Sequence, residues 1–262
     1  MLVHPSFDPV LFDLGVVKVH WYGLMYVLGF AGAYLVANLR KSTLNWSSDD
    51  VSDLFFYSAL GVIFGGRIGY CLLYDPLKYL SDPLQIILGI QDGGMSFHGG
   101  FLGVVFAVIY FAKKQENRLS DVADFVAVLA PIGLFFGRIG NFINQELWGR
   151  TTDLPWGMVF PLSGDGLSRH PSMLYEAFFE GLLLFIVLFI YSRTSRRAWS
   201  VTGLFLLGYG IARFLIEFVR IPDEHIGYLF GNWFTIGQLY TLPMIFIGFY
   251  LLFMSKKINV KI

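Results

Sequence analysis

The chain has 262 residues, of which 55% are hydrophobic and only 15% are charged, whereas about 25% are charged in ordinary soluble domains. Basic and acidic residues balance at 19 each, so no net charge attracts a nucleic acid, and we expect no nucleic-acid partner. The single cysteine, Cys71, lies in an apolar run and excludes both an internal disulfide framework and a cysteine-based zinc site. This is the composition of an integral membrane protein.

Seven apolar segments are long enough to be expected to cross a bilayer core of about 30 Å. Residues 1–15 lack the basic region and cleavage site of a secretory signal, so we expect the first segment to stay in the membrane. The segments lie near 17–39, 52–74, 95–112, 121–143, 173–191, 200–220 and 235–254. We therefore predict an all-α, polytopic membrane protein that forms a single membrane domain over residues 1–262.

The basic residues between these segments indicate the orientation. Most of them follow odd-numbered segments: Arg40, Lys41, Lys113, Lys114, Arg118, Arg193, Arg196, Arg197, Lys256, Lys257 and Lys261. By the positive-inside rule, the N-terminus is then outside and the C-terminus is in the cytoplasm. The longest outer connection, 144–172, contains Pro155, Pro161, Gly164 and Gly166, which predict an ordered extracytoplasmic cap.

A first polar cluster lies in GYGIARFLIEFVR, residues 208–220. If this segment is helical, one face carries Tyr209, Arg213, Glu217 and Arg220, because they are spaced four, four and three residues apart. One interpretation is a salt-bridge ladder that only holds helices together. The other is an anion site that carries its own counter-charge.

A second cluster lies in GRIGNFINQELWG, residues 137–149, at the end of an apolar segment. Arg138 and Asn141 share a helical face, and Glu146 follows among further amides. The cluster is either a helix end rich in hydrogen-bonding groups or part of a binding site. Arg67, in the second apolar segment, likewise needs a partner or water, since a buried arginine in a bilayer is costly.

A third candidate is FHGGFLG, residues 97–103, in which His98 precedes two glycines at the start of the third segment. The glycines allow close approach of another helix or of a ligand, and His98 is either a hydrogen-bonding residue or a catalytic one. The five histidines include no pair three or four residues apart, and the chain has no HExxH, P-loop, dinucleotide or GxSxG motif. We expect neither a metal ion nor a cofactor.

Arginines suit phosphate because the guanidinium forms paired hydrogen bonds with it. Several arginines near the outer leaflet therefore favour a phospholipid headgroup site. A multi-span transporter of an anionic solute or lipid would also place charged groups inside the membrane, and the residues alone do not separate these two functions.

Six segments carry a resemblance to a known family. They are HWYGLMY (20–26), GGRIGY (65–70), MSFHGG (95–100), GRIGNFINQELWG (137–149), RHPSMLYE (169–176) and GYGIARFLIEFVR (208–220). In this order they resemble the prolipoprotein diacylglyceryl transferases over essentially the whole chain. The departures are a shorter connection between Gly149 and Arg169, and Met173 where glutamine is familiar.

The resemblance implies an enzyme of the bacterial inner membrane, with its active site facing the extracytoplasmic side. Such a transferase moves the diacylglyceryl group of phosphatidylglycerol to the lipobox cysteine in the signal peptide of a prolipoprotein, forms a thioether and releases glycerol phosphate. Besides these substrates its partners are membrane lipids. The implied catalytic residues are His98, Arg138, Arg213 and Glu217. The implied substrate-binding residues are Tyr22, Asn141, Glu146, Gly149 and Tyr209, to which we add Arg67 and Arg220.

We expect Arg138 and Arg213 to grip the lipid phosphate and Glu217 to orient Arg213. Asn141, with Tyr22 or Tyr209, would position the glycerol and headgroup oxygens, and Glu146 would fix the turn of residues 137–149. His98 is the expected base for the thiol.

Overall fold

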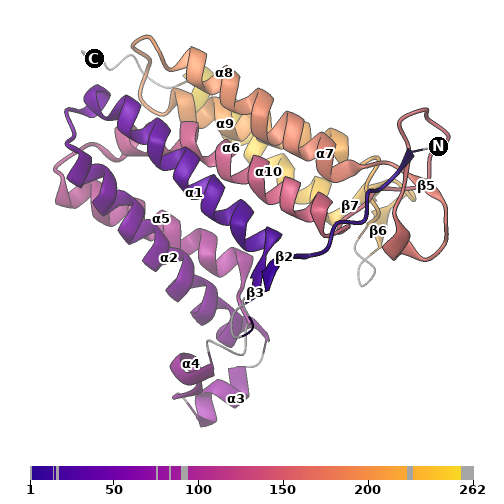
Figure 1. Cartoon of the computed structure of the whole chain (residues 1–262). Helices are drawn as coiled ribbons and strands as arrows, with labels where there is room; N and C mark the ends of the chain where they lie inside the picture. Colours follow the sequence, from indigo (N-terminus) through magenta and orange to yellow (C-terminus); the bar gives the residue numbers. More distant parts are fainter. Residues whose placement is uncertain are drawn as a thin grey trace. The chain divides into compact units, whose positions relative to one another are not determined.

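The computed structural model describes residues 2–13, 15, 18–74, 76–82, 84–89, 94–222 and 227–254 (Figure 1). His225 and the three lysines near the C-terminus lie outside the described residues. The helices are α1 (Trp21–Arg40), η1 (Lys41–Leu44), α2 (Ser48–Tyr74), α3 (Pro76–Ser81), α4 (Gln85–Leu88), α5 (Phe97–Lys114), α6 (Leu119–Ile143), η3 (Pro161–Ser163), α7 (Ser172–Glu176), the π-helix η4 (Ala177–Leu183), α8 (Leu184–Tyr191), α9 (Ser200–Ile216) and α10 (Ile236–Met254). The strands are β1 (Leu2–Val3), β2 (Val10–Asp13), β3 (Lys18–His20), β4 (Met158–Val159), β5 (Ser168–Arg169), β6 (Tyr228–Phe230) and β7 (Phe234–Thr235).

Each of the seven predicted segments coincides with a long helix or, for 173–191, with the continuous run α7–η4–α8. In the described part of the chain, five helical stretches are long and apolar enough to cross a membrane: Trp21–Leu44, Ser48–Leu72, Leu119–Ile143, Ser172–Tyr191 and Ile236–Phe253. The helix Ser200–Ile216 is apolar but shorter. The mostly helical, multi-span character is confirmed, whereas the count of seven spans stays a prediction.

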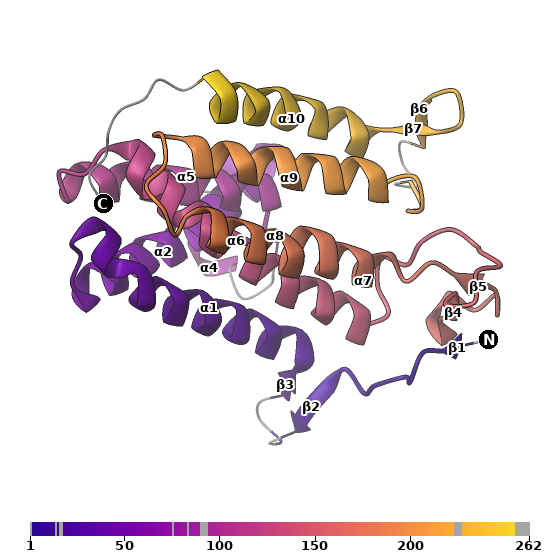
Figure 2. The same ribbon diagram turned by 90° about the horizontal axis from the view of Figure 1, so that it is seen from above.

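The chain divides into two compact units, which are described separately. The larger unit contains Met1–Val36 and Asp124–Ile262, and the smaller unit contains Ala37–Ala123. In the larger unit α1, α6, the α7–η4–α8 run, α9 and α10 lie side by side (Figure 2).

Glycines set the spacing of the helices in the larger unit. A Cβ on Gly248 of α10 would overlap Leu207 and Gly203 of α9, and a Cβ on Gly181 would overlap Phe135 of α6. Small residues let helix backbones approach closely, which matters in lipid because the bilayer supplies no hydrophobic drive for helix association. The glycines thus bring α6, η4, α9 and α10 close enough for side chains to meet between them.

The smaller unit is built on the pair α2 and α5. A Cβ on Gly103 would overlap the main chain of Gly61, and one on Gly99 would overlap Gly65 and Gly69. Of the two possibilities that the sequence left open for Gly99 and Gly103, close approach to another helix is therefore confirmed. GxxxG spacing on both helices produces this contact.

Substituting Gly103 by alanine is expected to destabilise the protein by about 2 kcal/mol or more, because a methyl group there meets rigid main chain. Gly100→Ala is the matched control, since its added methyl group would lie 3.6 Å from the carbonyl oxygen of Val62, an ordinary contact. Thermal unfolding in detergent compares the two. Equal transition temperatures for both variants would show that the α2–α5 contact is not as close as described.

The extracytoplasmic cap predicted over 144–172 contains β4, β5 and η3, and the N-terminal strand β1 joins it. Leu2 and Val3 pair in parallel with Met158 and Val159, and β4 pairs antiparallel with β5. His4 is buried; its Nε2 lies 2.9 Å from the carbonyl oxygen of Phe142. The position of residues 2–4 beside the cap was not predictable from the sequence, because their partners are more than 130 residues away.

Burial of His4 lowers its pKa below the ordinary value of 6.5. The unfolded chain then binds more protons than the folded one, so His4 favours docking of β1 above about pH 6.5 and opposes it as the pH falls. We expect amide exchange in β1 and β4, measured relative to the intrinsic rate of an unprotected amide at the same pH, to rise as the pH falls from about 7.5 to 5. In His4→Gln the rise is expected to be smaller, with a remainder from His170, whose pKa is also lowered by burial and by Arg150. An equal rise in the variant would contradict the role of His4.

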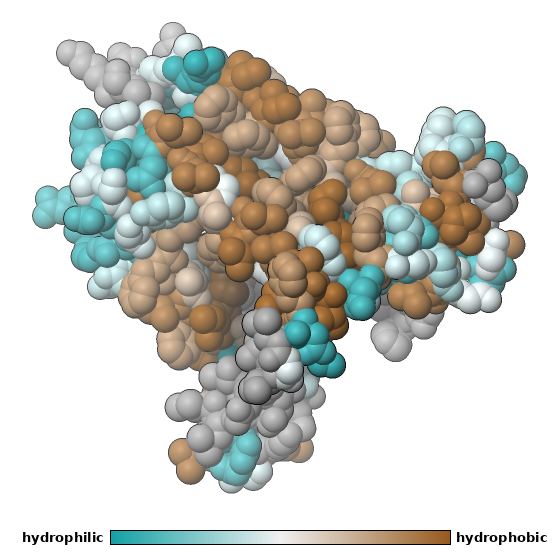
Figure 3. Space-filling view, in the orientation of Figure 1, coloured by the Kyte–Doolittle hydropathy of each residue, from teal (hydrophilic) through white to brown (hydrophobic). Residues whose placement is uncertain are grey.

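Large apolar side chains cover the outer faces of the helices (Figure 3). Examples are Val27 and Leu35 on α1, and Phe246, Phe249 and Tyr250 on α10, all exposed. Such a surface suits contact with lipid.

Candidate active site

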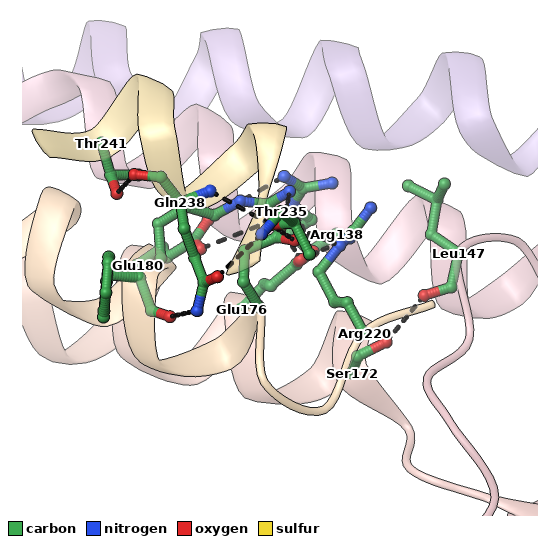
Figure 4. A network of polar contacts seen from close by, with 12 residues as sticks. Arg138, Leu147, Ser172, Glu176, Glu180, Arg220, Thr235, Gln238 and Thr241 are labelled. Atoms are coloured by element: carbon green, nitrogen blue, oxygen red, sulfur yellow. Dashed lines mark hydrogen bonds and ion pairs between the residues drawn. The ribbon is translucent and has the colours of Figure 1, made fainter. Parts of the chain in front are cut away.

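Two buried carboxylates form the centre of the site. Glu176 ends α7, Glu180 follows in η4, and both side chains are fully buried between α6, α9 and α10 (Figure 4). A π-helix is rare and is frequent at functional sites. Charged groups buried in this way require oppositely charged partners.

Three arginines from different parts of the chain supply those partners. Arg138 of α6 places Nε 2.9 Å from Oε2 of Glu176, and Arg220 places Nη1 2.6 Å from Oε1 of the same carboxylate. Arg213 of α9 donates to Glu176 Oε1 as well. Glu180 is more distant, with oxygens 3.9 Å from Arg138 and 4.0 Å from Arg213. Glu176 is therefore the common partner of all three guanidinium groups.

Glu217 completes the network. Its Oε1 lies 2.6 Å from Nη2 of Arg213 and 3.3 Å from Nε of Arg220, as in the ladder predicted from the sequence. Its Oε2 accepts a hydrogen bond from the hydroxyl of Thr235 at 2.9 Å. Thr235 and Gln238 cap α10 reciprocally: the Thr235 main chain donates to the Gln238 side chain, and the Gln238 main chain donates to the Thr235 hydroxyl. The start of α10 thus fixes Glu217.

The predicted helix through Arg220 is too long. Regular helix α9 ends at Ile216, and residues 217–219 form a turn. Arg220 instead pairs with Gly149 in an isolated β-bridge, and Arg150 donates to the carbonyl oxygen of Val219 at 2.8 Å. These contacts with residues far away in the sequence compete with continuation of the helix.

The arginine side chains are partly exposed to solvent, whereas the two central carboxylates are not. The side chains of Arg138 and Arg213 are 19% and 16% exposed, whereas those of Glu176 and Glu180 are 0% exposed. Arg138 contacts Glu176 through Nε, and its Nη2 lies 3.9 Å from Glu180. The buried carboxylates therefore contact the guanidinium groups on their buried side, and part of each of these two arginine side chains stays exposed.

Residues 137–149 leave α6 through a turn held by Glu146. The Asn141 side chain donates to Oε2 of Glu146 at 3.0 Å, and the Asn144 side chain donates to Oε1 at 3.1 Å. Gln145 and Leu147 both have a positive φ, so the chain reverses sharply here. The polar groups of this segment shape the turn beside Arg138.

Gly149 lies where a side chain would not fit. A Cβ there would overlap the carbonyl oxygen of Val219 and the side chain of His170. Its own N–H donates to the carbonyl oxygen of His170 at 2.8 Å. Gly149 thus joins the turn after α6 to the segment that enters α7 and to Arg220.

The two tyrosines predicted for the site also lie in the larger unit. The ring of Tyr22 packs on Gly140, two residues after Arg138, and its hydroxyl lies 3.4 Å from that of Tyr26. Tyr209 stacks with Phe205 on α9, one turn before Arg213.

His98 and Arg67 lie in the smaller unit. His98 is exposed in the first turn of α5, where the Ser96 side chain caps the helix by accepting from the N–H of Gly99. Arg67 is buried; it donates to the main-chain oxygens of Gln85 and Ile86 at 2.8 and 2.9 Å. Arg67 therefore holds the segment around α4 in place.

Glu176 and Glu180 were not among the site residues predicted from the sequence. Their signal was two carboxylates four residues apart within an apolar, lipid-length segment, where a charge needs a partner. We paired the arginines only with Glu217, which is local in sequence. Among the described residues, no group of three or more His, Cys, Asp or Glu side chains is placed to hold a metal ion.

Comparison with known proteins identifies the family. Residues 9–254 match the family of prolipoprotein diacylglyceryl transferases. A phosphatidylglycerol–prolipoprotein diacylglyceryl transferase of Pseudomonas entomophila (strain L48) is 50% identical over 97% of this chain and 96% of its own length. One of Solidesulfovibrio magneticus is 51% identical over 96% of each chain. The chain therefore belongs to the prolipoprotein diacylglyceryl transferase family.

Proposed function

We propose that the chain transfers the diacylglyceryl group of phosphatidylglycerol to the lipobox cysteine of a prolipoprotein; its relatives are named phosphatidylglycerol–prolipoprotein diacylglyceryl transferases. Membership of the family makes the chain a transferase. The observation that supports an anionic lipid as the substrate is the pair of partly exposed guanidinium groups of Arg138 and Arg213, which are paired with buried glutamates. A transporter remains the alternative suggested by intramembrane charges, but the family match favours the enzyme.

In this proposal Arg138 and Arg213 bind the phosphate of the lipid. Arg138 keeps Nη1 for a ligand, because Nε is the atom close to Glu176. Phosphate accepts paired hydrogen bonds from guanidinium, and such bonds are stronger where water is excluded. Glu217 orients Arg213 from one side, while Glu176 ties Arg213, Arg138 and Arg220 together.

The remaining residues position the substrate. Asn141, with Tyr22 or Tyr209, contacts the glycerol and headgroup oxygens. Glu146 fixes the turn after α6 through Asn141, and Gly149 permits the close contact with Arg220. Arg67 is a further proposed substrate-binding residue; in the structure its side chain donates to the main chain around α4.

The transfer is a substitution at a saturated carbon. The cysteine sulfur of the peptide bonds to the glycerol carbon, the bond from that carbon to the phosphate oxygen breaks, and glycerol phosphate leaves with the electron pair. The thiol proton passes to a base, and the arginines stabilise the charge that grows on the leaving phosphate. The nucleophile belongs to the substrate, so Cys71, which is buried, has no role in this step.

His98 is the base that we propose, and His98→Gln tests it. Loss of the base is expected to lower the transfer rate about 10²-fold and to remove a step from its pH profile. Gln115→His, at the other end of α5, is a control for histidine titration elsewhere. Near-normal turnover of His98→Gln with an unchanged pH profile would place the base elsewhere.

The topology that fits this function has seven spans, with the N-terminus outside and the C-terminus in the cytoplasm. With that alternation the starts of α1, α5, α7 and α10 and the ends of α2, α6 and α9 all face outward, so every proposed site residue lies in the outer half of its helix or in an adjoining extracytoplasmic segment. Basic residues of the loops after α1, α5 and α8 then face the cytoplasm. We place the enzyme in the bacterial inner membrane as a single membrane domain, with the cap over 144–172.

The test is transfer in vesicles that contain purified protein, phosphatidylglycerol and a lipobox peptide. The proposal predicts a peptide heavier by one diacylglyceryl group, joined by a thioether. A peptide with serine in place of cysteine is the control and is expected to gain no mass. If the folded protein forms no adduct but moves an anion across the bilayer, the result would support transport instead.

A further inference from the structure

Glu180 is a buried carboxylate that the proposed chemistry does not use. Its side chain is fully buried, and neither oxygen has a hydrogen-bond partner among the described residues. Its nearest cationic atoms are Nη2 of Arg138 at 3.9 Å and Nη1 of Arg213 at 4.0 Å. An ionised carboxylate in such a place is poorly stabilised, because burial removes water and no donor replaces it.

The other two carboxylates of the network are held much more closely. Glu176 has cationic nitrogens at 2.9 and 2.6 Å, from Arg138 and Arg220, in addition to Arg213. Glu217 has Arg213 at 2.6 Å and a hydrogen bond from Thr235. If one of the three carboxylates takes up a proton, Glu180 is therefore the one whose protonation weakens the fewest close ion pairs and hydrogen bonds.

The charges of the network balance only while the site is empty. Three arginines face three glutamates, Arg138, Arg213 and Arg220 against Glu176, Glu180 and Glu217, so the fully ionised network is neutral. The phosphodiester of phosphatidylglycerol adds one negative charge. It would also draw Arg138 and Arg213 toward itself, and these are the two cations near Glu180.

We propose that Glu180 binds a proton when the anionic lipid enters, so that lipid and proton bind together. This inference rests on the proposed function, because it takes the lipid phosphate as the ligand. The proton comes from the solvent and joins an oxygen of Glu180. It keeps the network neutral within a region of low dielectric, where an uncompensated charge is costly.

The groups around Glu180 are consistent with this. Arg138 faces it from α6, Arg213 and Tyr209 from α9, and Glu176 from the preceding turn, with Arg220 beyond. Glu176 Oε1 and Glu180 Oε1 both lie near Nη1 of Arg213, so two like charges share one nitrogen. Helix α10 contains no Asp, Glu, Lys, Arg or His. Helix α10 therefore offers Glu180 no cation in addition to Arg138 and Arg213.

Coupled binding has a measurable signature. By linkage, a site that takes up one proton with its ligand binds that ligand about tenfold more weakly for each unit of rising pH. This slope holds where the free site is ionised and the occupied site is protonated. The phosphodiester itself does not titrate in that range.

The experiment is calorimetric titration of the purified full chain in nonionic detergent with short-chain phosphatidylglycerol. Buffers of different ionisation enthalpy give the number of protons taken up, between about pH 6 and pH 9. The variants are Glu180→Gln and the control Glu116→Gln, an exposed glutamate between α5 and α6. Phosphatidylcholine of the same chain length, which is zwitterionic, is the control ligand.

We expect the native chain and Glu116→Gln to take up close to one proton per lipid. Glu180→Gln is expected to bind the lipid with no proton uptake and with an affinity that no longer depends on pH. Equal uptake by Glu180→Gln, or none by the native chain, would overturn the inference. Infrared difference spectra of the native chain decide the case even if Glu180→Gln does not fold, because a protonated carboxyl band must appear when phosphatidylglycerol is added.

The vesicle assay separates the two proposals. A native chain that makes the thioether product without proton uptake retains its proposed function and contradicts only the role of Glu180. A chain that neither binds phosphatidylglycerol nor makes the product contradicts both.

Discussion

Replacing Arg213 by lysine is expected to lower the rate of diacylglyceryl transfer about 10²-fold or more. The guanidinium of Arg213 already contacts Glu176 through Nη1 and Glu217 through Nη2. An ammonium group is a point charge and does not hold two carboxylates and a phosphate in the same plane. Arg138→Lys is expected to have a similar effect, because Arg138 contacts Glu176 through Nε and, in the proposed function, also binds the phosphate.

The control for these variants is Arg118→Lys, an exposed arginine in the turn between α5 and α6. Initial rates of thioether formation in phosphatidylglycerol vesicles, at matched amounts of folded protein, measure the effect. Full activity in both Arg138→Lys and Arg213→Lys would remove the argument that the arginines clamp a phosphate.

Replacing Glu176 by glutamine is expected to be the most destabilising change in the site. Glu176 is fully buried and is the common partner of Arg138, Arg213 and Arg220. Removing one partner of a buried ion pair costs about 3 to 5 kcal/mol, because the charges left behind have neither water nor a counter-charge. Transfer is expected to fall with it, since both phosphate-binding arginines lose their common support.

The midpoint of thermal unfolding in detergent measures this effect, with Glu116→Gln as the matched control. Glu180→Gln is a second comparison in the same helical run. Its loss of stability is expected to be smaller, because Glu180 has no hydrogen-bond partner to lose. An unfolding midpoint for Glu176→Gln close to that of Glu116→Gln would contradict the central position of Glu176.

The helices were predictable because each one must satisfy its own backbone in lipid. A helix that crosses lipid therefore appears in the sequence as a long apolar run. The predicted segments near 121–143 and 173–191 match α6 and the α7–η4–α8 run within two residues. The end of α9 was not predictable in the same way. It depends on Arg220 meeting Gly149 and on Arg150 meeting Val219, contacts between residues about 70 positions apart.

The site was predicted in part. Arg138, Arg213, Glu217 and Arg220 do meet, because buried charges in a membrane protein need each other. The same argument applied to Glu176 would have placed it among them. Spacing within one helix gave only Glu217 as a partner, and pairing between helices depends on glycine contacts, such as Gly181 on Phe135, that identify no partner in the sequence.

The most direct test of this account is the distance between the lipid phosphorus and the arginine side chains. Solid-state NMR of the chain in bilayers, with ¹⁵N-labelled arginine and the ³¹P of phosphatidylglycerol, measures their dipolar coupling. The account predicts coupling to two guanidinium groups, one lost in Arg138→Lys and the other in Arg213→Lys. Coupling that is absent, or that survives unchanged in both variants, would contradict the claim that these arginines bind the phosphate.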